Sequence, residues 1–264
     1  MAHDSYRCAR LRRSLPSLLA GLGMMALSQA SRATTCALPL QGEGRVAAVI
    51  DSRTLRLDDG SEIRLAGIEP AARATEAQAA LSNLVAGRDV RLHGDTDSPD
   101  RYGRQQAFVF TADDALSVQG RLLGAGAALM AGNIADKACA AELATAEREA
   151  RRGKRGIWVN NDVIKNTESP GDILFDMGRF ALVEGRVRSV RQLGTVTYLN
   201  FGRRWTQDFA VIIPRRMMAA YEQAGITLKS LERQRIRVRG WVERRGGPRI
   251  EVSRVGQIEV VGDD

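Results

Sequence analysis

Residues 44–70 read GRVAAVIDSRTLRLDDGSEIRLAGIEP, and this stretch decides the fold. Apolar residues occupy alternate positions before Asp51 and again over Leu55–Leu57, which is the period of a β-strand with one buried face. Asp59-Gly60 is typical of a hairpin turn, and the alternation resumes over Ile63–Leu65. The stretch therefore predicts three consecutive antiparallel strands.

The residues after this stretch predict two more strands and a helical cover. Helical spacing of apolar residues favours helices over residues 72–86, 115–124 and 138–152, and two strand-like runs lie over Val90–Leu92 and Ala107–Phe110. An order of three strands, a helix, two strands and further helices is typical of a small five-stranded Greek-key barrel of the OB type. We expect this barrel, with about three helices, to occupy residues 44–158.

The remaining sequence predicts a second barrel. Residues 159–177 are polar and rich in turn formers, which is typical of a linker. Residues 178–262 then hold three strand-like runs, a helix near residues 215–223 and more strand-like runs. The expected fold class is therefore α+β, mainly β with helices, with two OB-type Greek-key barrels in tandem.

The first 30 residues have the pattern of a secretory signal. Several arginines precede an apolar run, and small residues follow it, so cleavage is expected near Ala30 or Ala33. The apolar run is too short to span a bilayer. We therefore expect a periplasmic or secreted protein, because the signal directs export.

Cleavage of the signal would leave two cysteines, Cys36 and Cys139. In an oxidising compartment they most simply form one disulfide, and the alternative is two unrelated buried thiols. The chain has only 2 histidines, so two cysteines and two histidines far apart in sequence cannot build a structural zinc site of the usual kind.

Positive charge is concentrated late in the chain. After Lys165 there are 17 Lys and Arg residues against 12 Asp and Glu, and all but one of these cations are arginine. The planar guanidinium binds phosphate through two parallel hydrogen bonds and stacks on bases, so this part is a candidate for contact with a polyanion. A solvated surface with a modest charge surplus is the alternative.

Three motifs between Gly44 and Trp158 resemble those of the staphylococcal nuclease (thermonuclease) family. They are Asp51-Ser52-Arg53-Thr54, Arg64-Leu65-Ala66-Gly67-Ile68-Glu69-Pro70 and Tyr102-Gly103-Arg104. The resemblance implies an OB barrel and calcium-dependent phosphodiester hydrolysis. It also implies that Arg64 and Arg104 keep the two phosphate-binding arginines, and that Glu69 keeps a carboxylate at the second metal-binding position. The block after residue 178 resembles the C-terminal extension of some secreted members of the family.

Two positions depart from the family pattern. Arg53 stands where the family has its first metal-binding aspartate, and Ala72 stands where it has the glutamate base. Calcium needs several oxygen ligands, usually including at least two carboxylates, and a guanidinium at the first position repels a divalent ion. We therefore expect no cofactor, no metal ligand set, and an incomplete catalytic set of Arg64, Glu69 and Arg104. Arg53 could instead join Arg64 and Arg104 in binding phosphate.

A second candidate site lies in the later barrel, where aromatic residues alternate with arginines. Tyr198, Arg203, Arg204 and Trp205 are the residues predicted to contact nucleic acid. OB folds bind single strands with such a combination, through stacking on aromatic rings and ion pairs with phosphates.

These observations support one hypothesis and two alternatives. The first is an exported protein of this family that binds nucleic acid or another phosphate polyanion, with the calcium-dependent hydrolysis lost. The second is an active but atypical nuclease that uses Arg64, Glu69 and Arg104. The third is a non-catalytic interaction module of the cell envelope, because OB folds host many functions.

Overall fold

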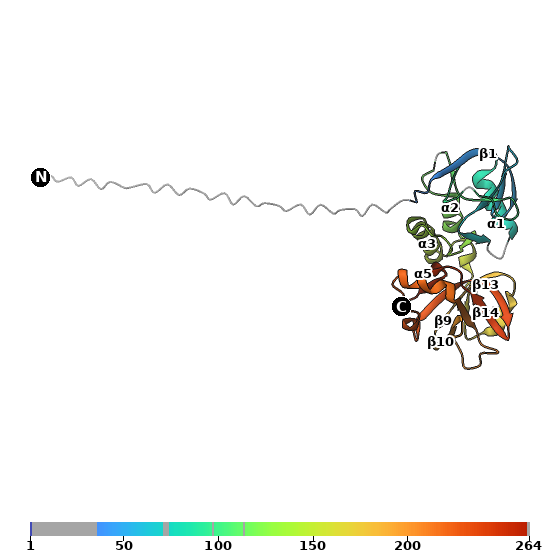
Figure 1. The fold of residues 1–264 in the computed structure, drawn as a ribbon. Helices are drawn as coiled ribbons and strands as arrows, with labels where there is room; N and C mark the ends of the chain where they lie inside the picture. Colours follow the sequence, from blue (N-terminus) through green and yellow to red (C-terminus); the bar gives the residue numbers. More distant parts are fainter. Residues whose placement is uncertain (2–35, 71–73, 97, 113, 263–264) are drawn as a thin grey trace. The chain divides into compact units, whose positions relative to one another are not determined.

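A computed structural model of the protein describes residues 1, 36–70, 74–96, 98–112 and 114–262 (Figure 1). The expected signal, residues 1–30, lies outside the described residues apart from Met1, as does Ala72. None of the described helices combines the length and the apolar character needed to cross a membrane.

The first sheet closes into the expected five-stranded barrel. Its strands, in order around the barrel, are β1 (Leu40–Asp51), β2 (Thr54–Leu57), β3 (Glu62–Leu65), β6 (Gln105–Thr111) and β5 (Asp89–His93). The long β1 pairs with β5 through residues 40–45 and with β2 through residues 46–51, so a single strand closes both sides of the barrel. The alternating apolar residues of the opening stretch fill its core, where Leu55, Ile63 and Leu65 are buried.

Three helices accompany this barrel, and their types agree with the sequence-based expectation. They are α1 (Ala74–Val85), α2 (Val118–Gly124) and α3 (Lys137–Arg152), followed by a short 3-10 helix, η1 (Gly156–Val159). A separate antiparallel pair is formed by β4 (Ile68–Pro70) and β7 (Ala128–Met130). β4 follows β3 after a turn of only two residues. This short turn keeps Glu69 of β4 close to the end of β3.

The structure contains the expected disulfide between Cys36 and Cys139. It joins the residues just before β1 to the first turn of α3, across a sequence separation of 103 residues. Asp136 caps the same helix, because its carboxylate accepts a hydrogen bond of 2.8 Å from the backbone N–H of Cys139. The disulfide and this capping hydrogen bond therefore both hold the first turn of α3.

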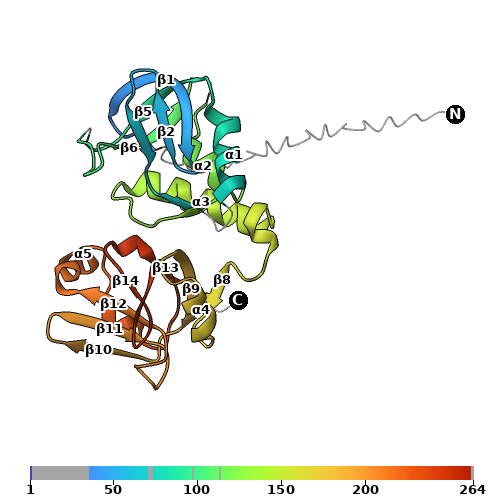
Figure 2. The ribbon, with the colours of Figure 1, turned by 90° about the vertical axis from the view of Figure 1, so that its right-hand side faces the viewer.

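The second sheet has eight strands in the order β10-β11-β12-β14-β13-β9-β8, with β15 paired to β13 (Figure 2). The strands are β8 (Ile164–Asn166), β9 (Phe180–Arg186), β10 (Ser189–Leu193), β11 (Val196–Asn200), β12 (Ala210–Pro214), β13 (Arg235–Arg245), β14 (Gly247–Glu251) and β15 (Ile258–Val260). Its helices are α4 (Pro170–Phe175) and α5 (Met218–Gln223), with short 3-10 helices η2 (Arg215–Met217), η3 (Leu228–Leu231) and η4 (Val255–Gln257). As β1 does in the first sheet, the long β13 pairs with different neighbours along its length: β9 and β15 first, then β14.

Two features of the second part differ from the sequence-based expectation. Residues 159–177, expected as a linker, hold β8 and α4, and β8 pairs in parallel with β9. β8 is short and polar, and it joins the edge of the sheet through backbone hydrogen bonds. Its sequence therefore lacks the alternation of apolar residues from which strands are predicted. The sheet is also larger than a five-stranded barrel, and in the part of the chain that the structure describes its end strands β10 and β8 do not pair with each other.

A buried ion pair connects the two sheets, which belong to one compact unit. Arg239 of β13 donates to Glu147 of α3 at 2.9 Å and to the carbonyl oxygen of Met130 at 2.8 Å. The other carboxylate oxygen of Glu147 accepts from the N–H of Met130 at 2.8 Å. Both side chains are about 95 % buried, with exposed fractions of 5% and 4%. Removal of one partner would leave an uncompensated charge inside the protein.

We expect loss of the disulfide to destabilise the fold. The Cys36→Ala/Cys139→Ala variant should lose about 2–5 kcal/mol of unfolding free energy, because a long loop of the unfolded chain is no longer closed. Urea unfolding followed by tryptophan fluorescence measures this. Each single variant, Cys36→Ala or Cys139→Ala, should lose about as much as the double variant, since the bridge needs both thiols. A reductant that leaves the transition of the parent protein unchanged would show that the bridge contributes nothing.

We expect Glu147→Leu to cost about 3–5 kcal/mol of unfolding free energy, because it removes the buried carboxylate of Arg239 and leaves only the half-exposed Glu259, 3.7 Å away, near the guanidinium. The double variant Glu147→Leu/Arg239→Met should lose much less, since both charges are gone. A double-mutant cycle in urea measures the coupling. Additive losses in the two single variants would contradict a direct interaction.

Candidate functional site

Arg53 lies in the tight turn that joins β1 to β2. Asp51 pairs with Thr54 across this turn, and the Asp51 carboxylate accepts a hydrogen bond of 2.8 Å from the backbone N–H of Arg53. The carbonyl oxygen of Arg53 accepts from the N–H of Leu65 at 2.8 Å. The backbone of Arg53 is therefore held on both sides, and Asp51 has the turn-forming role of an Asx residue.

The guanidinium of Arg53 forms an ion pair with the carboxylate of Glu69 on β4. Only 14% of the Arg53 side chain and 11% of the Glu69 side chain are exposed, so water screens this pair weakly. Gly67 lies in the turn between β3 and β4 that brings Glu69 to Arg53. Its backbone φ is +76°, which favours glycine, and a Cβ at this position would lie 2.7 Å from Ile134. The structure thus pairs Arg53 and Glu69, so their two charges neutralise each other.

Arg64 lies beside this pair, opposite Thr54 in the β2–β3 ladder. Burial lowers the pKa of Arg64, the charge of Arg53 lowers it further, and the charge of Glu69 partly offsets both effects. The charge of Arg104 also lowers the pKa of Arg64, by a smaller amount. Arg53 and Arg104 therefore both lie close enough to Arg64 to interact with it electrostatically. Among the described residues Arg64 makes no ion pair, so Glu69 binds Arg53 rather than Arg64.

Arg104 is held by Asp100 within the loop between β5 and β6. Its Nε and Nη2 atoms donate to Asp100 Oδ2 at 3.1 and 2.8 Å, while Asp100 Oδ1 accepts from the N–H groups of Tyr102 and Arg104. The guanidinium carbons of Arg101 and Arg104 lie 4.7 and 4.9 Å from the centre of the Tyr102 ring. The loop therefore presents a half-exposed cluster of two cations around one aromatic ring.

The carboxylates in this region are engaged by other groups of the protein. Glu69 is paired with Arg53, and Asp51 is engaged in the turn. Thr54 Oγ1 is buried without a hydrogen-bond partner, but a single hydroxyl cannot replace a carboxylate. Among the described residues, no group of three or more His, Cys, Asp and Glu side chains is arranged to hold a metal ion.

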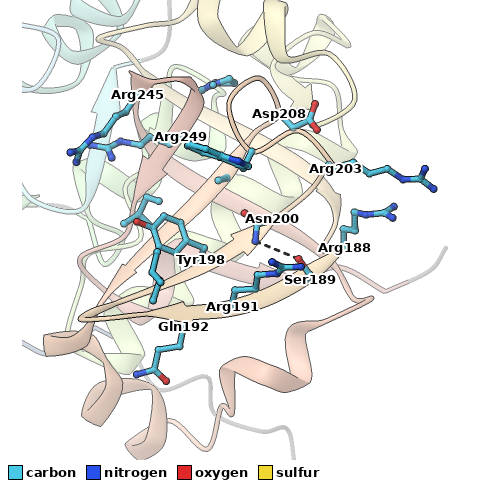
Figure 3. A pocket seen from close by; sticks show the side chains of 17 residues that line it. Arg188, Ser189, Arg191, Gln192, Tyr198, Asn200, Arg203, Asp208, Arg245 and Arg249 are labelled. Atoms are coloured by element: carbon cyan, nitrogen blue, oxygen red, sulfur yellow. Dashed lines mark hydrogen bonds between the residues drawn. The ribbon is translucent and has the colours of Figure 1, made fainter.

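A second candidate site is a cavity of about 1350 Å³ on the sheet formed by β10, β11, β12 and β14 (Figure 3). Tyr198, Arg203 and Trp205 line it, so the structure brings together three of the four residues predicted to contact nucleic acid. Arg204 does not line it, because its backbone N–H and its guanidinium are bound to Asp208 and Gln207.

The cavity also contains four arginines that the site prediction did not include: Arg188, Arg191, Arg245 and Arg249. In the view of Figure 3, Arg188 and Arg203 lie toward one end of the labelled set, and Arg245, Arg249 and Tyr198 lie toward the other. These residues come from segments up to about sixty positions apart, so only the pairing of the strands brings them together. Arg191 is the only charged residue of β10, so no local charge pattern indicates it.

We expect the pKa of Asp100 to be about 2 in the folded protein, against an ordinary value of 3.8, because Arg104 stabilises the charged carboxylate. A lowered carboxyl pKa stabilises the fold fully above its unfolded value, and this contribution is lost as the pH falls from about 4 to 2. NMR titration of the side-chain carboxyl carbon measures the pKa. Arg104→Gln should return it toward the ordinary value, whereas Arg88→Gln should not. A titration midpoint near 3.8 in the parent protein would contradict the pairing.

Comparison with known proteins finds one family match. The family model described as staphylococcal nuclease homologue matches residues 62–160, a range that contains Arg64, Glu69 and Arg104 and follows Arg53. A search of curated proteins finds no match. Together with the closed five-stranded barrel, the match shows that residues 62–160 belong to a staphylococcal nuclease-like domain of the OB fold.

Proposed function

We propose that this protein is exported, binds nucleic acid or another phosphate polyanion, and has lost the calcium-dependent hydrolysis of the staphylococcal nuclease family. One observation carries the loss of hydrolysis: the ion pair between Arg53 and Glu69 inside the nuclease-like domain. The binding function rests on the arginines that surround this pair and on those of the second sheet.

The electrostatic argument against calcium is direct. In the family, two carboxylates create a negative site that a divalent cation neutralises. In this chain the net charge of Arg53 and Glu69 is zero, and the nearby Arg64 adds a further positive charge. A Ca²⁺ ion would have to displace a permanently charged guanidinium from a largely buried carboxylate and then remain next to it. Phosphodiester hydrolysis of this type also needs a carboxylate to orient water, and Ala72 cannot supply one.

Export is supported by two independent features. The N-terminal residues have the charge, apolar core and small-residue pattern of a secretory signal. The Cys36–Cys139 disulfide is of the kind that persists in an oxidising compartment. A periplasmic or secreted protein would meet nucleic acid released from cells.

Binding of a polyanion is supported by the charge of the mature chain. The formal net charge of the whole sequence is +8, of which the first 30 residues carry +3 (4 Arg, 1 Asp), so residues 31–264 carry +5; all but one of the cations after Lys165 are arginine. Such a protein should bind phosphate polymers through release of their counterions, so its affinity should fall as salt concentration rises. The same charges would not by themselves distinguish DNA, RNA and inorganic polyphosphate.

We expect the purified protein to show no calcium-stimulated cleavage of DNA or RNA, because its ligand set lacks the first aspartate and the glutamate base. Arg53→Asp/Ala72→Glu should create calcium-dependent cleavage that EGTA abolishes. The matched control is Arg152→Asp/Ala141→Glu, which makes the same charge change on the exposed side of α3. Gel assays with a fluorescent oligonucleotide, with Ca²⁺ and with EGTA, measure the activity.

Two results would contradict this proposal. Calcium-stimulated cleavage by the parent protein would show that the site still works. Calcium-independent cleavage that disappears in Arg64→Ala would instead identify the atypical phosphodiesterase as the function. Cleavage that survives Arg64→Ala would indicate a contaminating nuclease, and a second purification would then decide.

A further inference from the structure

We propose that the cavity on β10, β11, β12 and β14 is a binding site for single-stranded nucleic acid. This inference rests on the proposed polyanion-binding function and deepens it by naming the site and the strandedness of the ligand. Its argument has three parts: which side chains face the cavity, which of its charges are free, and which groups can contact bases.

Strand alternation separates the cavity face from the core. On β11, Thr197 and Leu199 are buried in the core, while Tyr198 and Asn200 are partly exposed and line the cavity. On the neighbouring strand, Arg191 pairs with Tyr198 and Ser189 pairs with Asn200, so these side chains stand on the same face. The floor of the cavity is therefore a row of polar and aromatic side chains.

Most of the positive charges in the cavity are not neutralised. Arg188, Arg191, Arg203 and Arg245 are exposed, and in the described part of the chain none of them forms an ion pair. Arg249 is the exception, since it donates to Glu243 at 3.0 and 2.8 Å. The one acidic residue of the cavity, Asp208, accepts a hydrogen bond of 2.6 Å from the N–H of Arg204.

Several arginines elsewhere in the same sheet are paired with carboxylates. Arg237 and Arg235 both donate to Glu184, and Arg239 donates to Glu147. The cavity is thus not positive merely because arginine is abundant in this sheet. A concave surface with four unpaired guanidinium groups attracts a phosphate backbone and binds its oxygens in the geometry that arginine prefers.

Two aromatic side chains in the cavity can stack on bases. Trp205 is 77% exposed, which is unusual for the largest apolar side chain, and Tyr198 lies on the cavity floor. Ser189 and Asn200 also line the cavity, where the Asn200 amide nitrogen donates to the Ser189 hydroxyl oxygen at 3.4 Å. Their hydroxyl and amide groups can donate to and accept from base edges. In a duplex the base faces are already stacked on one another, so stacking on Trp205 requires an unpaired strand.

Two segments that carry exposed cavity residues are packed against each other. Arg245 is the last residue of β13, next to the turn into β14, and the loop between β11 and β12 carries Arg203 and Trp205. Gly247 allows their close approach, because a Cβ at this position would lie 2.5 Å from the carbonyl oxygen of Asp208. Within the loop between β11 and β12, the N–H of Asp208 donates to the carbonyl oxygen of Arg204 at 2.7 Å. The cavity is therefore largely preformed, which reduces the entropic cost of binding.

The test measures binding of the full chain to three probes by fluorescence anisotropy or competition. The probes are an oligothymidylate of about 16 nucleotides, a DNA duplex of the same length, and inorganic polyphosphate. We expect the single strand to bind more tightly than the other two. Trp205→Ala should weaken single-strand binding roughly tenfold and change polyphosphate binding less than about twofold, because only bases stack.

Arg191→Glu/Arg245→Glu should weaken binding of all three probes and reduce the salt dependence of single-strand binding by roughly 0.7 in logarithmic slope for each lost phosphate contact. Matched controls lie close by in the same sheet. Trp241→Ala removes an exposed tryptophan outside the cavity, and Arg244→Glu reverses a charge next to Arg245 but outside the cavity. Both controls should bind like the parent protein, and urea unfolding checks that every variant is folded.

The possible failures are distinguishable. Equal binding of single strand, duplex and polyphosphate, unchanged by Trp205→Ala, would overturn this inference and leave the proposed polyanion binding intact. Single-strand binding that is lost in Arg64→Ala but retained in the cavity variants would place the ligand on the nuclease-like domain and also overturn it. No binding to any probe at low salt would overturn both this inference and the proposed function.

Discussion

The ion pair between Arg53 and Glu69 is the interaction on which the chemistry of the nuclease-like domain depends. A two-residue turn places Arg53 at the end of β1, and the return of the chain through β4 brings Glu69 to it. The fold therefore brings the two side chains together from two different segments of the chain. Because one is a cation and the other a carboxylate, and both are largely buried, they stabilise an ion pair, and our proposal that calcium-dependent hydrolysis is lost depends on this pair.

The structure distributes its arginines between two roles. Some, such as Arg53, Arg237 and Arg239, are mostly buried and pair with carboxylates, so they stabilise contacts between elements. Others, including Arg191 and Arg245, are exposed around a cavity and have no such partner among the described residues. Composition alone cannot separate these groups, because the role of an arginine is set by whether the fold brings a carboxylate within reach of it.

The sequence predicted the first barrel well because its signals are local. Alternation before and after the turns places Leu55 and Ile63 in the core, and helical spacing predicts α1 and α3 to within a few residues. The second part was predicted less completely. The short polar strand β8 gives no alternating apolar pattern, so residues 159–177 had the composition of a linker although they contain part of the second sheet. β10 was not predicted for the same reason, since most of its residues are exposed.

The sequence by itself determined the resemblance of its motifs to the family and the presence of Arg53 and Ala72 where the family pattern predicts acidic residues, because motif order and spacing are properties of the chain alone. It also identified Tyr198, Arg203 and Trp205 as candidates. Only the tertiary structure decided that Glu69 pairs with Arg53 rather than with Arg64, and that Arg188, Arg191 and Arg245 share a cavity with Tyr198. These relations depend on strand pairing between distant segments, and no local pattern of residues records the distance between two side chains that the fold brings together.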